Sequence, residues 1–460
     1  MAETRLEATT RHSPTKLPLA LGAIVAALLL AFYIYGLNRD PIEFGLFTHP
    51  PVYGHWGPVF HNVGIVVGSA VMLLGIGAFY LARGSHSWML VVSLLLVGVL
   101  AGAGVTLIRG EKNHLTRGVS TSQEFTYYSA DIHLVEEYGI VGFAQAHAHL
   151  TSEFRSYASK THPPGTHILL YLLYELWGEH PLRVSTSLAL GGLSAGLAAW
   201  FTAMSLGGDL EARTALLLFL VTPGALLFAF TAMDLFFAVF MAASAAIFMF
   251  SLSRDSPWMS ALAGAVLGLA TLFTFASAFV AIAAAIAAPF ILRDSKRAAV
   301  HIAAASGSGL VVLATATVLL GFDFVGSYVS IPPFESPYDP YWIFANPAVV
   351  LMFAGLPVVM FALPELFRSW ARRSGLFFLV ILLGVMVAWG SLPSEITHLR
   401  QGEVERTWAF LYPLLAAAAG IGLVRWSSRL KTPIWAVFVV AGLLSIGQAV
   451  LIQAHWDTLF

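Results

Sequence analysis

The sequence lacks cysteine altogether and has few charged residues for its length. Without cysteine, disulfides, thiolate zinc sites and thioether-linked haem are excluded, although the redox compartment stays open. Lys, Arg, Asp and Glu make up 11% of the 460 residues, whereas soluble domains carry about a quarter. The formal net charge of -1 gives no reason to expect a nucleic-acid partner. A soluble enzyme, a secreted disulfide scaffold and a disordered chain are therefore excluded.

Long apolar runs fill the chain instead, and 58% of its residues are hydrophobic. A transmembrane helix takes about 20 residues. We therefore predict an all-α polytopic membrane protein with about 13 transmembrane helices. The segments are Leu17–Leu37, Val63–Ala82, Trp88–Ile108, Val184–Leu206, Thr214–Met233, Leu235–Leu252, Trp258–Phe275, Ser277–Leu292, Val300–Phe322, Ala348–Leu363, Leu376–Leu392, Trp408–Val424 and Ile434–Ile452.

Two of the apolar runs are too long to be single spans. As one helix, Thr214–Leu252 would measure about 58 Å and Trp258–Leu292 about 52 Å. Both lengths far exceed the ~30 Å hydrocarbon core, so each run must fold back. Asp234 marks the first turn, and Phe275–Ser277 is the expected place of the second.

Charge places the loops on two sides of the membrane. With the N-terminus in the cytoplasm, most Lys and Arg residues fall on short inner loops, as the positive-inside rule requires. Most acidic residues and histidines then fall outside. Leu17–Leu37 is expected to be an anchor, because its run is too long for a cleaved signal peptide and no small-x-small site follows. We expect a cell-membrane protein whose chemistry lies on the outer, periplasmic or extracellular, side.

One outer loop, residues 109–165, is too long to be a mere connector. Helical spacing in Ala130–Tyr138 and Val141–Tyr157 predicts two helices lying in the membrane interface. The loop closes on His162-Pro163-Pro164-Gly165, and its prolines forbid a continuous helix. His167–Trp177 follows. It is too short to span the membrane and is expected to be re-entrant or interfacial.

The order of these motifs resembles a known family. An acid beside aromatic residues (Tyr127–Asp131), a His-Pro-Pro-Gly loop end (162–165), a span opening on Arg183 and an outward-facing Asp234 follow one another. This order is similar to the GT-C superfamily of membrane glycosyltransferases, in the branch of protein O-mannosyltransferases and aminoarabinose transferases. Gly402–Trp408 also looks like a motif of bacterial members. The likeness covers Trp88 to Leu252 best, so residues 1–87 would be an N-terminal addition of a cytoplasmic tail and two helices.

The resemblance implies an enzyme. Such proteins move a sugar from a polyprenyl-phosphate carrier to a glycan, lipid or protein acceptor at the outer face, usually with inversion. A carboxylate in the first long outer loop acts as general base. On this basis residues 88–292 form the GT-C-like core, with the catalytic loop 109–165. Residues 293–460 add helices and two outer loops, 323–347 and 393–407.

The candidate residues follow from that chemistry, because an acceptor hydroxyl needs a positioned base. Asp131 is the first choice for the base and Glu124 the second. For Asp131 the alternative is a charge that merely favours a helix N-terminus. The leaving lipid phosphate needs cations rather than a proton donor. Arg406 and Arg400 are the phosphate candidates, with a snorkelling interface arginine as the alternative for Arg406.

Other residues are expected to help bind the substrate. His162 would contact the donor phosphate or orient the base, or else cap the helix that follows it. Tyr128 would support a sugar ring, and Glu403 stands beside the phosphate candidates. Asp234, at the tip of an apolar hairpin, would contact a ligand or cap the hairpin.

No metal site and no cofactor are predicted. His147 and His149 stand two residues apart, which on a helix points them to different sides, and no third ligand is evident. The chain has no Asp-x-Asp motif. A divalent cation stays an open alternative, since some relatives in the superfamily need one.

Two other functions compete with the transferase. A secondary transporter would need charged groups at mid-membrane and two similar halves, and neither is seen. A non-catalytic membrane protein of cell-envelope assembly is the second alternative. Besides membrane lipids, the expected partners are the polyprenyl-phosphate-linked sugar and its acceptor.

Overall fold

The computed structural model describes residues 16–37, 55–83, 88–110, 112–120, 128–178, 180–332, 341–392 and 404–457. Almost all the ordered elements in these ranges are helices, which confirms the predicted all-α class. The exception is one antiparallel pair of two-residue strands, in which His55 pairs with Asp457 and Trp56 with Trp456.

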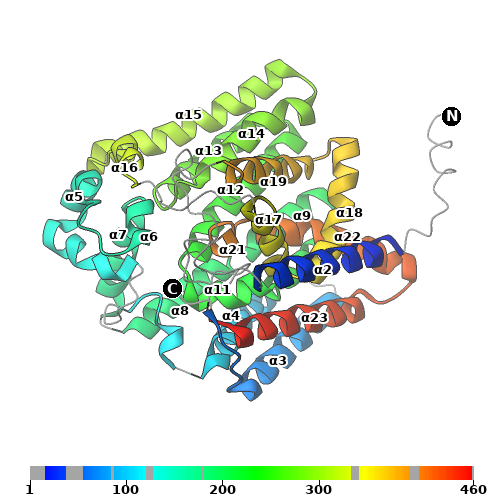
Figure 1. The fold of residues 1–460 in the computed structure, drawn as a ribbon. Helices are drawn as coiled ribbons and strands as arrows, with labels where there is room; N and C mark the ends of the chain where they lie inside the picture. Colours follow the sequence, from blue (N-terminus) through cyan, green and yellow to red (C-terminus); the bar gives the residue numbers. More distant parts are fainter. Residues whose placement is uncertain are drawn as a thin grey trace.

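The helices follow one another along the chain with short connections (Figure 1). In the first half they are α2 (Lys16–Leu37), α3 (Val63–Arg83), α4 (Trp88–Thr106), η2 (Leu107–Arg109), η3 (Lys112–Leu115), η4 (Tyr128–Asp131), α5 (Ile132–Leu150), α6 (Tyr157–Thr161), α7 (Gly165–Trp177), α8 (Pro181–Leu193), α9 (Gly196–Leu206), α10 (Asp209–Leu220) and α11 (Pro223–Thr231). In the second half they are α12 (Asp234–Arg254), α13 (Pro257–Thr271), α14 (Ser277–Leu292), α15 (Ser295–Leu320), α16 (Phe324–Val329), α17 (Tyr341–Ala354), α18 (Leu356–Arg372), α19 (Phe377–Gly390), α21 (Val404–Thr407), α22 (Leu411–Leu430) and α23 (Ile434–His455). The strands are β1 (His55–Trp56) and β2 (Trp456–Asp457).

Several helices are long and apolar enough to cross a membrane. Six of those in the described ranges meet this test, or up to eight if each of two bent pairs is one span. Further apolar helices, such as α13 and α14, are shorter than a full span. This multi-pass architecture matches the sequence-based expectation, whereas the count of about 13 spans is not confirmed.

Both predicted fold-backs are present. The first run breaks after Thr231, and α12 then begins at Asp234. The second breaks between Thr271 and Ser277. The expected single span Ala348–Leu363 is wrong, because α17 ends at Ala354 and α18 leaves at an angle of 111°. Gly355 makes this bend at a φ of 91°, a backbone conformation that glycine adopts without a steric penalty.

The core of the protein surrounds α22. This helix is buried over most of its length, and it packs against α9, α10 and α18. Ala416–Ala419 are all fully buried, so small side chains allow the helices to approach closely. By contrast, almost none of α15 is buried, although this helix is long enough to span a membrane.

The elements of the first long loop lie together at one side of the bundle, where α5, α6 and α7 are joined by α16 (Figure 1). Two helices are expected in this loop, and α5 consists of two helical segments that are separated at Gly139, whose φ of 68° and ψ of 165° are not helical. The expected end at Tyr157 is wrong, because α5 stops at Leu150 and Ser156 begins α6 as its N-cap. The short helix predicted at His167–Trp177 is present as α7.

Candidate functional site

Asp131 lies in η4 and is completely buried. Its carboxylate accepts two backbone hydrogen bonds, from the amide of Arg155 to Oδ1 (2.9 Å) and from that of Ser156 to Oδ2 (3.1 Å). Hydrogen bonds to an ionised acceptor are about twice as strong as neutral ones. Asp131 therefore fixes the turn that leads into α6, and does not cap its own helix.

His162 follows α6 and comes within reach of Asp234. Its Nδ1 lies 3.0 Å from the carbonyl oxygen of Ala158, and a carbonyl can only accept, so Nδ1 is the donor. In the neutral ring Nε2 is then an acceptor, and it faces Oδ1 of Asp234 at 3.9 Å.

Tyr128 joins this cluster through its ring. The ring centroid of Tyr128 lies 5.1 Å from that of His162 in an edge-on arrangement, and 6.1 Å from that of Phe237. Since Phe237 and Asp234 both lie in the first turn of α12, the aromatic contacts hold η4, α6 and α12 together. Tyr128, Asp131, His162 and Asp234 thus belong to one site, which we call the outer cluster.

Two buried histidines, His147 and His167, lie next to the outer cluster, and no sequence pattern predicts this position. His167 stacks on Phe154 with a centroid distance of 5.4 Å, and His147 lies 6.3 Å from His167. Burial lowers the pKa of His147 to about 3, against a smaller opposing effect of the His162 carbonyl. Burial also lowers the pKa of His167 well below its usual range. Both rings are therefore neutral and serve packing rather than charge.

His147 connects the loop helix α5 to α16. Its Nδ1 shares a hydrogen bond of 3.1 Å with the hydroxyl of Ser327, which joins α5 to α16. Within the described ranges, no group of three or more His, Asp or Glu side chains is placed to hold a metal ion.

Gly165 explains the end of the His-Pro-Pro-Gly motif. Its amide donates to the carbonyl oxygen of Leu272, just beyond α13, at 3.1 Å. A Cβ at this position would lie 2.3 Å from the same oxygen, so only glycine fits. The motif therefore docks the loop onto the end of α13.

Arg406 lies on α21, which contacts both α11 and α12. The structure adds two cations that the sequence did not single out, Arg155, which is exposed, and Lys160, which is partly buried. Both lie on the segment that Asp131 holds. Glu124, Arg400 and Glu403 lie outside the described residues.

An apolar cavity of about 400 Å³ opens between α12, α13, α14 and α15. Its lining is almost entirely hydrocarbon and small side chains, from Phe248 and Ile302 at one end to Thr271 and Val280 at the other. Thr271 is the residue before Leu272, which receives Gly165. One end of the cavity therefore lies near the end of α13 on which Gly165 docks.

Comparison with known proteins gives structural likenesses alone. No family model matches the chain, and no curated protein does so either. Among solved structures, ArnT from Cupriavidus metallidurans bound to undecaprenyl phosphate is similar over 75% of this chain and 63% of its own, with a TM-score of 0.46 and 16% identity. The apo state of ArnT is similar with a TM-score of 0.45 and 16% identity, over 63% of this chain and 55% of its own.

The oligosaccharyltransferase of Archaeoglobus fulgidus, in complex with Zn and sulfate, is also similar. Its TM-score is 0.41 and its identity 12%, over 78% of this chain and 53% of its own. The present chain thus spans between about half and two thirds of the length of these structures. At such scores the assignment of function rests on the residues of the chain itself.

Proposed function

We propose that the protein is a membrane glycosyltransferase that moves a sugar from a polyprenyl-phosphate carrier to an acceptor at the outer face, with inversion. The observation that carries the proposal is the outer cluster itself, in which Asp131 is held by two backbone amides and Nε2 of His162 faces Asp234. A lipid-linked sugar has the matching parts, namely a polar head for the cluster and a hydrocarbon tail for the apolar helices.

Asp131 is the proposed general base, and Glu124 stays the alternative. Its two backbone hydrogen bonds aim the carboxylate, and each oxygen keeps a lone pair that can take a proton. Because the side chain is fully buried, the proposal requires that the bound acceptor uncover one carboxylate oxygen. The resulting alkoxide attack displaces the lipid phosphate from the anomeric carbon, and the acceptor proton goes to Asp131.

The leaving phosphate carries its own negative charge, so its stabilisation falls to cations and hydrogen-bond donors. Arg406 and Arg400 are proposed for this role. His162, whose Nε2 lies 3.9 Å from Oδ1 of Asp234, is proposed to contact the donor phosphate or to orient the base. Tyr128 and Glu403 are proposed to position the sugar.

The experiment is a transfer assay with purified protein in detergent, a polyprenyl-phosphate sugar and candidate acceptors. Release of polyprenyl phosphate that depends on the protein is the expected result, and chelator should leave it intact. If no donor is consumed but a solute crosses proteoliposomes, the protein is a transporter. If neither occurs in folded protein, the envelope-assembly role replaces the enzyme.

The proposed location is tested in cells. Because the chain has no cysteine, Ser120→Cys and Ser295→Cys each introduce one unique thiol. An impermeant maleimide should label intact cells at position 120 and fail to label them at 295. The reverse pattern would place the outer cluster in the cytoplasm and would remove the proposed site from the outer face.

A further inference from the structure

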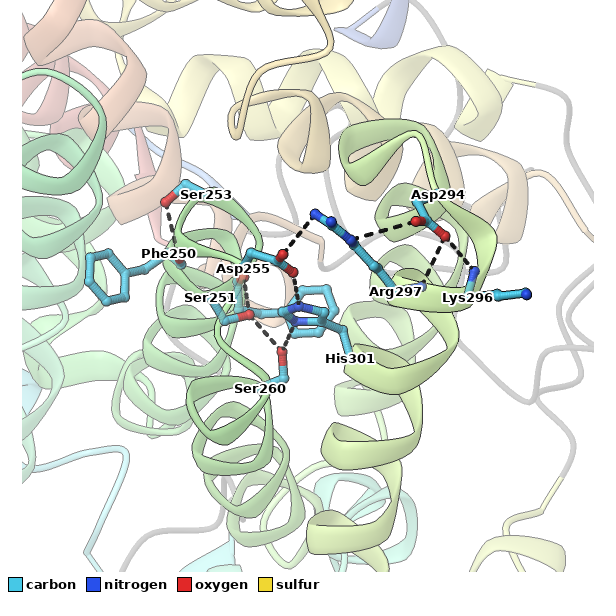
Figure 2. A network of polar contacts seen from close by, with 10 residues as sticks. Phe250, Ser251, Ser253, Asp255, Ser260, Asp294, Lys296, Arg297 and His301 are labelled. Atoms are coloured by element: carbon cyan, nitrogen blue, oxygen red, sulfur yellow. Dashed lines mark hydrogen bonds and ion pairs between the residues drawn. The ribbon is translucent and has the colours of Figure 1, made fainter.

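Two polar turns meet at one end of the bundle (Figure 2). One joins α12 to α13 and contains Asp255, and the other joins α14 to α15 and contains Asp294. Arg297 bridges them, because its Nη1 lies 2.9 Å from Oδ2 of Asp255 and its Nε 3.6 Å from Oδ2 of Asp294. Since α12 begins at Asp234 in the outer cluster and ends at Arg254, these turns lie at the end opposite the outer cluster.

The two turns carry an excess of positive charge. Residues 253–258 and 292–298 contain two aspartates and four exposed cations, which leaves a net charge of +2; the cations are Arg254, Arg293, Lys296 and Arg297. Both aspartates contact Arg297, and the side chain of Lys296 points away from Asp255 in Figure 2. Exposed cations that outnumber the acids beside them attract a phosphate group.

The apolar cavity between α12, α13, α14 and α15 starts a short way along the helices from these cations. Ile302 and Phe248, which line it, lie five and six residues from Arg297 and Arg254, or about 7–9 Å along α15 and α12. The cavity and the cations therefore belong to the same corner of the bundle.

The walls of the cavity suit a hydrocarbon chain. Most of the lining consists of alanine, glycine, leucine and other apolar residues. The hydroxyls of Ser244 and Thr271 donate to the backbone carbonyl oxygens of Ala263 and Leu267, each at 2.8 Å, so neither has a proton left for a ligand. A polar group inside the cavity would find few hydrogen-bond partners, whereas an acyl chain needs none.

Unequal packing of the helices holds the cavity open. On one side α15 approaches α13 closely, since a Cβ on Gly264 would lie 1.9 Å from the Ala305 carbonyl oxygen. On the other side α14 presents small side chains such as Ala284 and Ala285, which leave a gap between α14 and α15. Ala285 and Ser306 line this gap and are exposed, so the cavity opens sideways toward the bilayer.

We propose that this corner binds an anionic glycerophospholipid, with one acyl chain in the apolar cavity and the phosphate in contact with Arg293, Lys296 and Arg297. Charge complementarity selects a lipid with a negative headgroup, as basic clusters between membrane helices do. The distance of about 7–9 Å between cations and cavity leaves room for the glycerol and ester groups.

This lipid differs from the proposed sugar donor, because its phosphate lies at the end of the bundle opposite the outer cluster. The inference therefore does not depend on the transferase activity. An acyl chain gains little when it leaves bulk lipid for an apolar cavity, since both are equally apolar. Selectivity for the lipid therefore comes from the cations.

Native mass spectrometry of the full-length protein in detergent tests the charge, with phosphatidylglycerol and phosphatidylcholine of identical chains as probes. The wild type should bind one phosphatidylglycerol about tenfold or more tightly than phosphatidylcholine. The double variant Arg293→Gln/Lys296→Gln should lower the affinity for phosphatidylglycerol about 25-fold, since each cation contributes about fivefold. Its affinity for phosphatidylcholine should be unchanged. Arg429→Gln/Lys431→Gln, which removes two exposed cations near the turn between α22 and α23, is the matched control.

A second pair of variants tests the position of the chain. Ala285→Phe fills the cavity from its open side without a change of charge, and should weaken binding of both lipids about tenfold because the chain loses its contacts with the walls. Ile282→Phe is the control, since Ile282 is exposed on the same helix but does not line the cavity.

Equal affinity of the wild type for the two lipids, a comparison that needs no variant, would overturn the role of the cations, as would equal losses in the two double variants. Equal binding by Ala285→Phe and Ile282→Phe would exclude the chain from the cavity and overturn the proposal. Release of phosphatidylglycerol by excess inorganic phosphate would replace the lipid site with a site for free phosphate. Release by polyprenyl phosphate would assign the cavity to the donor instead.

Discussion

The two ends of the bundle each hold an aspartate–histidine pair, but the pairs differ in their surroundings. His301 has a hydrogen-bond partner at each ring nitrogen, and its Nε2 lies 3.2 Å from Asp255. His162 uses Nδ1 on a backbone carbonyl and leaves 3.9 Å between Nε2 and Asp234. The atoms of the first pair are within hydrogen-bond distance, whereas those of the second pair are too far apart for a direct hydrogen bond. Identical residue types thus form a direct contact at one end and a wider pair, which we propose to take part in substrate binding, at the other.

The largest expected effect is at Asp131. Asp131→Asn should lower transfer by about 10²–10⁴-fold, the usual contribution of a general base. The assay is single-turnover release of polyprenyl phosphate, run beside a donor-binding measurement. Glu153→Gln, an exposed carboxylate near the same turn, is the matched control and should be fully active. If Asp131→Asn lowered the rate of transfer by less than about tenfold, Glu124 would replace Asp131 as the proposed general base.

Donor affinity is the next quantity to change. Arg406→Ala removes a charge proposed to hold the phosphate, and charge-assisted hydrogen bonds contribute about 1.5–3 kcal/mol. The Kd for the donor should therefore rise about tenfold to a hundredfold. Arg254→Ala, on the opposite end of the bundle, should leave the Kd unchanged. If both variants changed the Kd for the donor equally, Arg406 would not bind the phosphate directly.

The two aspartates can be separated by one pair of variants. Asp234→Asn should lower turnover about tenfold or more, at an unchanged unfolding temperature, because it removes the charge facing His162. Asp255→Asn should lower the unfolding temperature by about 2–4 °C and leave turnover nearly intact. Parallel measurement of both quantities checks the contrast. If both variants lower only the unfolding temperature, the pair of His162 and Asp234 has a structural role, like the pair of His301 and Asp255.

Gly165 offers a purely steric test. An added Cβ would lie 2.3 Å from the Leu272 carbonyl oxygen, which belongs to the backbone and cannot move freely. Gly165→Ala should cost about 1–3 kcal/mol in the free energy of unfolding, the range for overpacking. Gly142→Ala, where the nearest atom would be 3.5 Å away, is the control. If the docking of the loop did not contribute to stability, chemical denaturation would give the same free energy of unfolding for both variants.

The last prediction concerns the pH dependence that His147 gives to the stability of the fold. The pKa of His147 falls from its usual 6.5 to about 3 on folding, so between these values only the unfolded chain binds the proton. Stability should drop by up to about 1.4 kcal/mol per pH unit as the pH falls through this window. His147→Gln, which does not titrate, should flatten the decline of the unfolding temperature between about pH 6.5 and 4.5. If the unfolding temperature of His147→Gln declined with falling pH as steeply as that of the wild type, burial would not suppress protonation of His147.

The sequence predicted the features that depend on length and polarity. A membrane limits the length of a span, so the two folded-back runs and the turn at Asp234 could be derived without a structure. The motif 162–165 was placed correctly at a loop end because proline excludes the alternatives. The bend at Gly355 was missed, since its apolar neighbours read as one continuous span.

The contacts within the site could not be derived in the same way. The partners of Asp131 are backbone amides, and every residue except proline carries one, so no sequence pattern singles out Arg155 or Ser156. His147 and His167 are far apart in sequence and meet only through tertiary packing. Their signal was weak, because a histidine in an apolar stretch suits a core as well as a ligand set.

The short strand pair has a consequence for how the protein is made. The guanidinium of Arg109 donates to the carbonyl oxygens of both Gly57 and Gln453, and β1 pairs with β2 beside it. The helices α3 and α4 also pack against α23, which is far away in the sequence. During synthesis these contacts can form only after α23 has left the ribosome. Until then, the faces of α3 and α4 that meet α23 have to be covered by lipid.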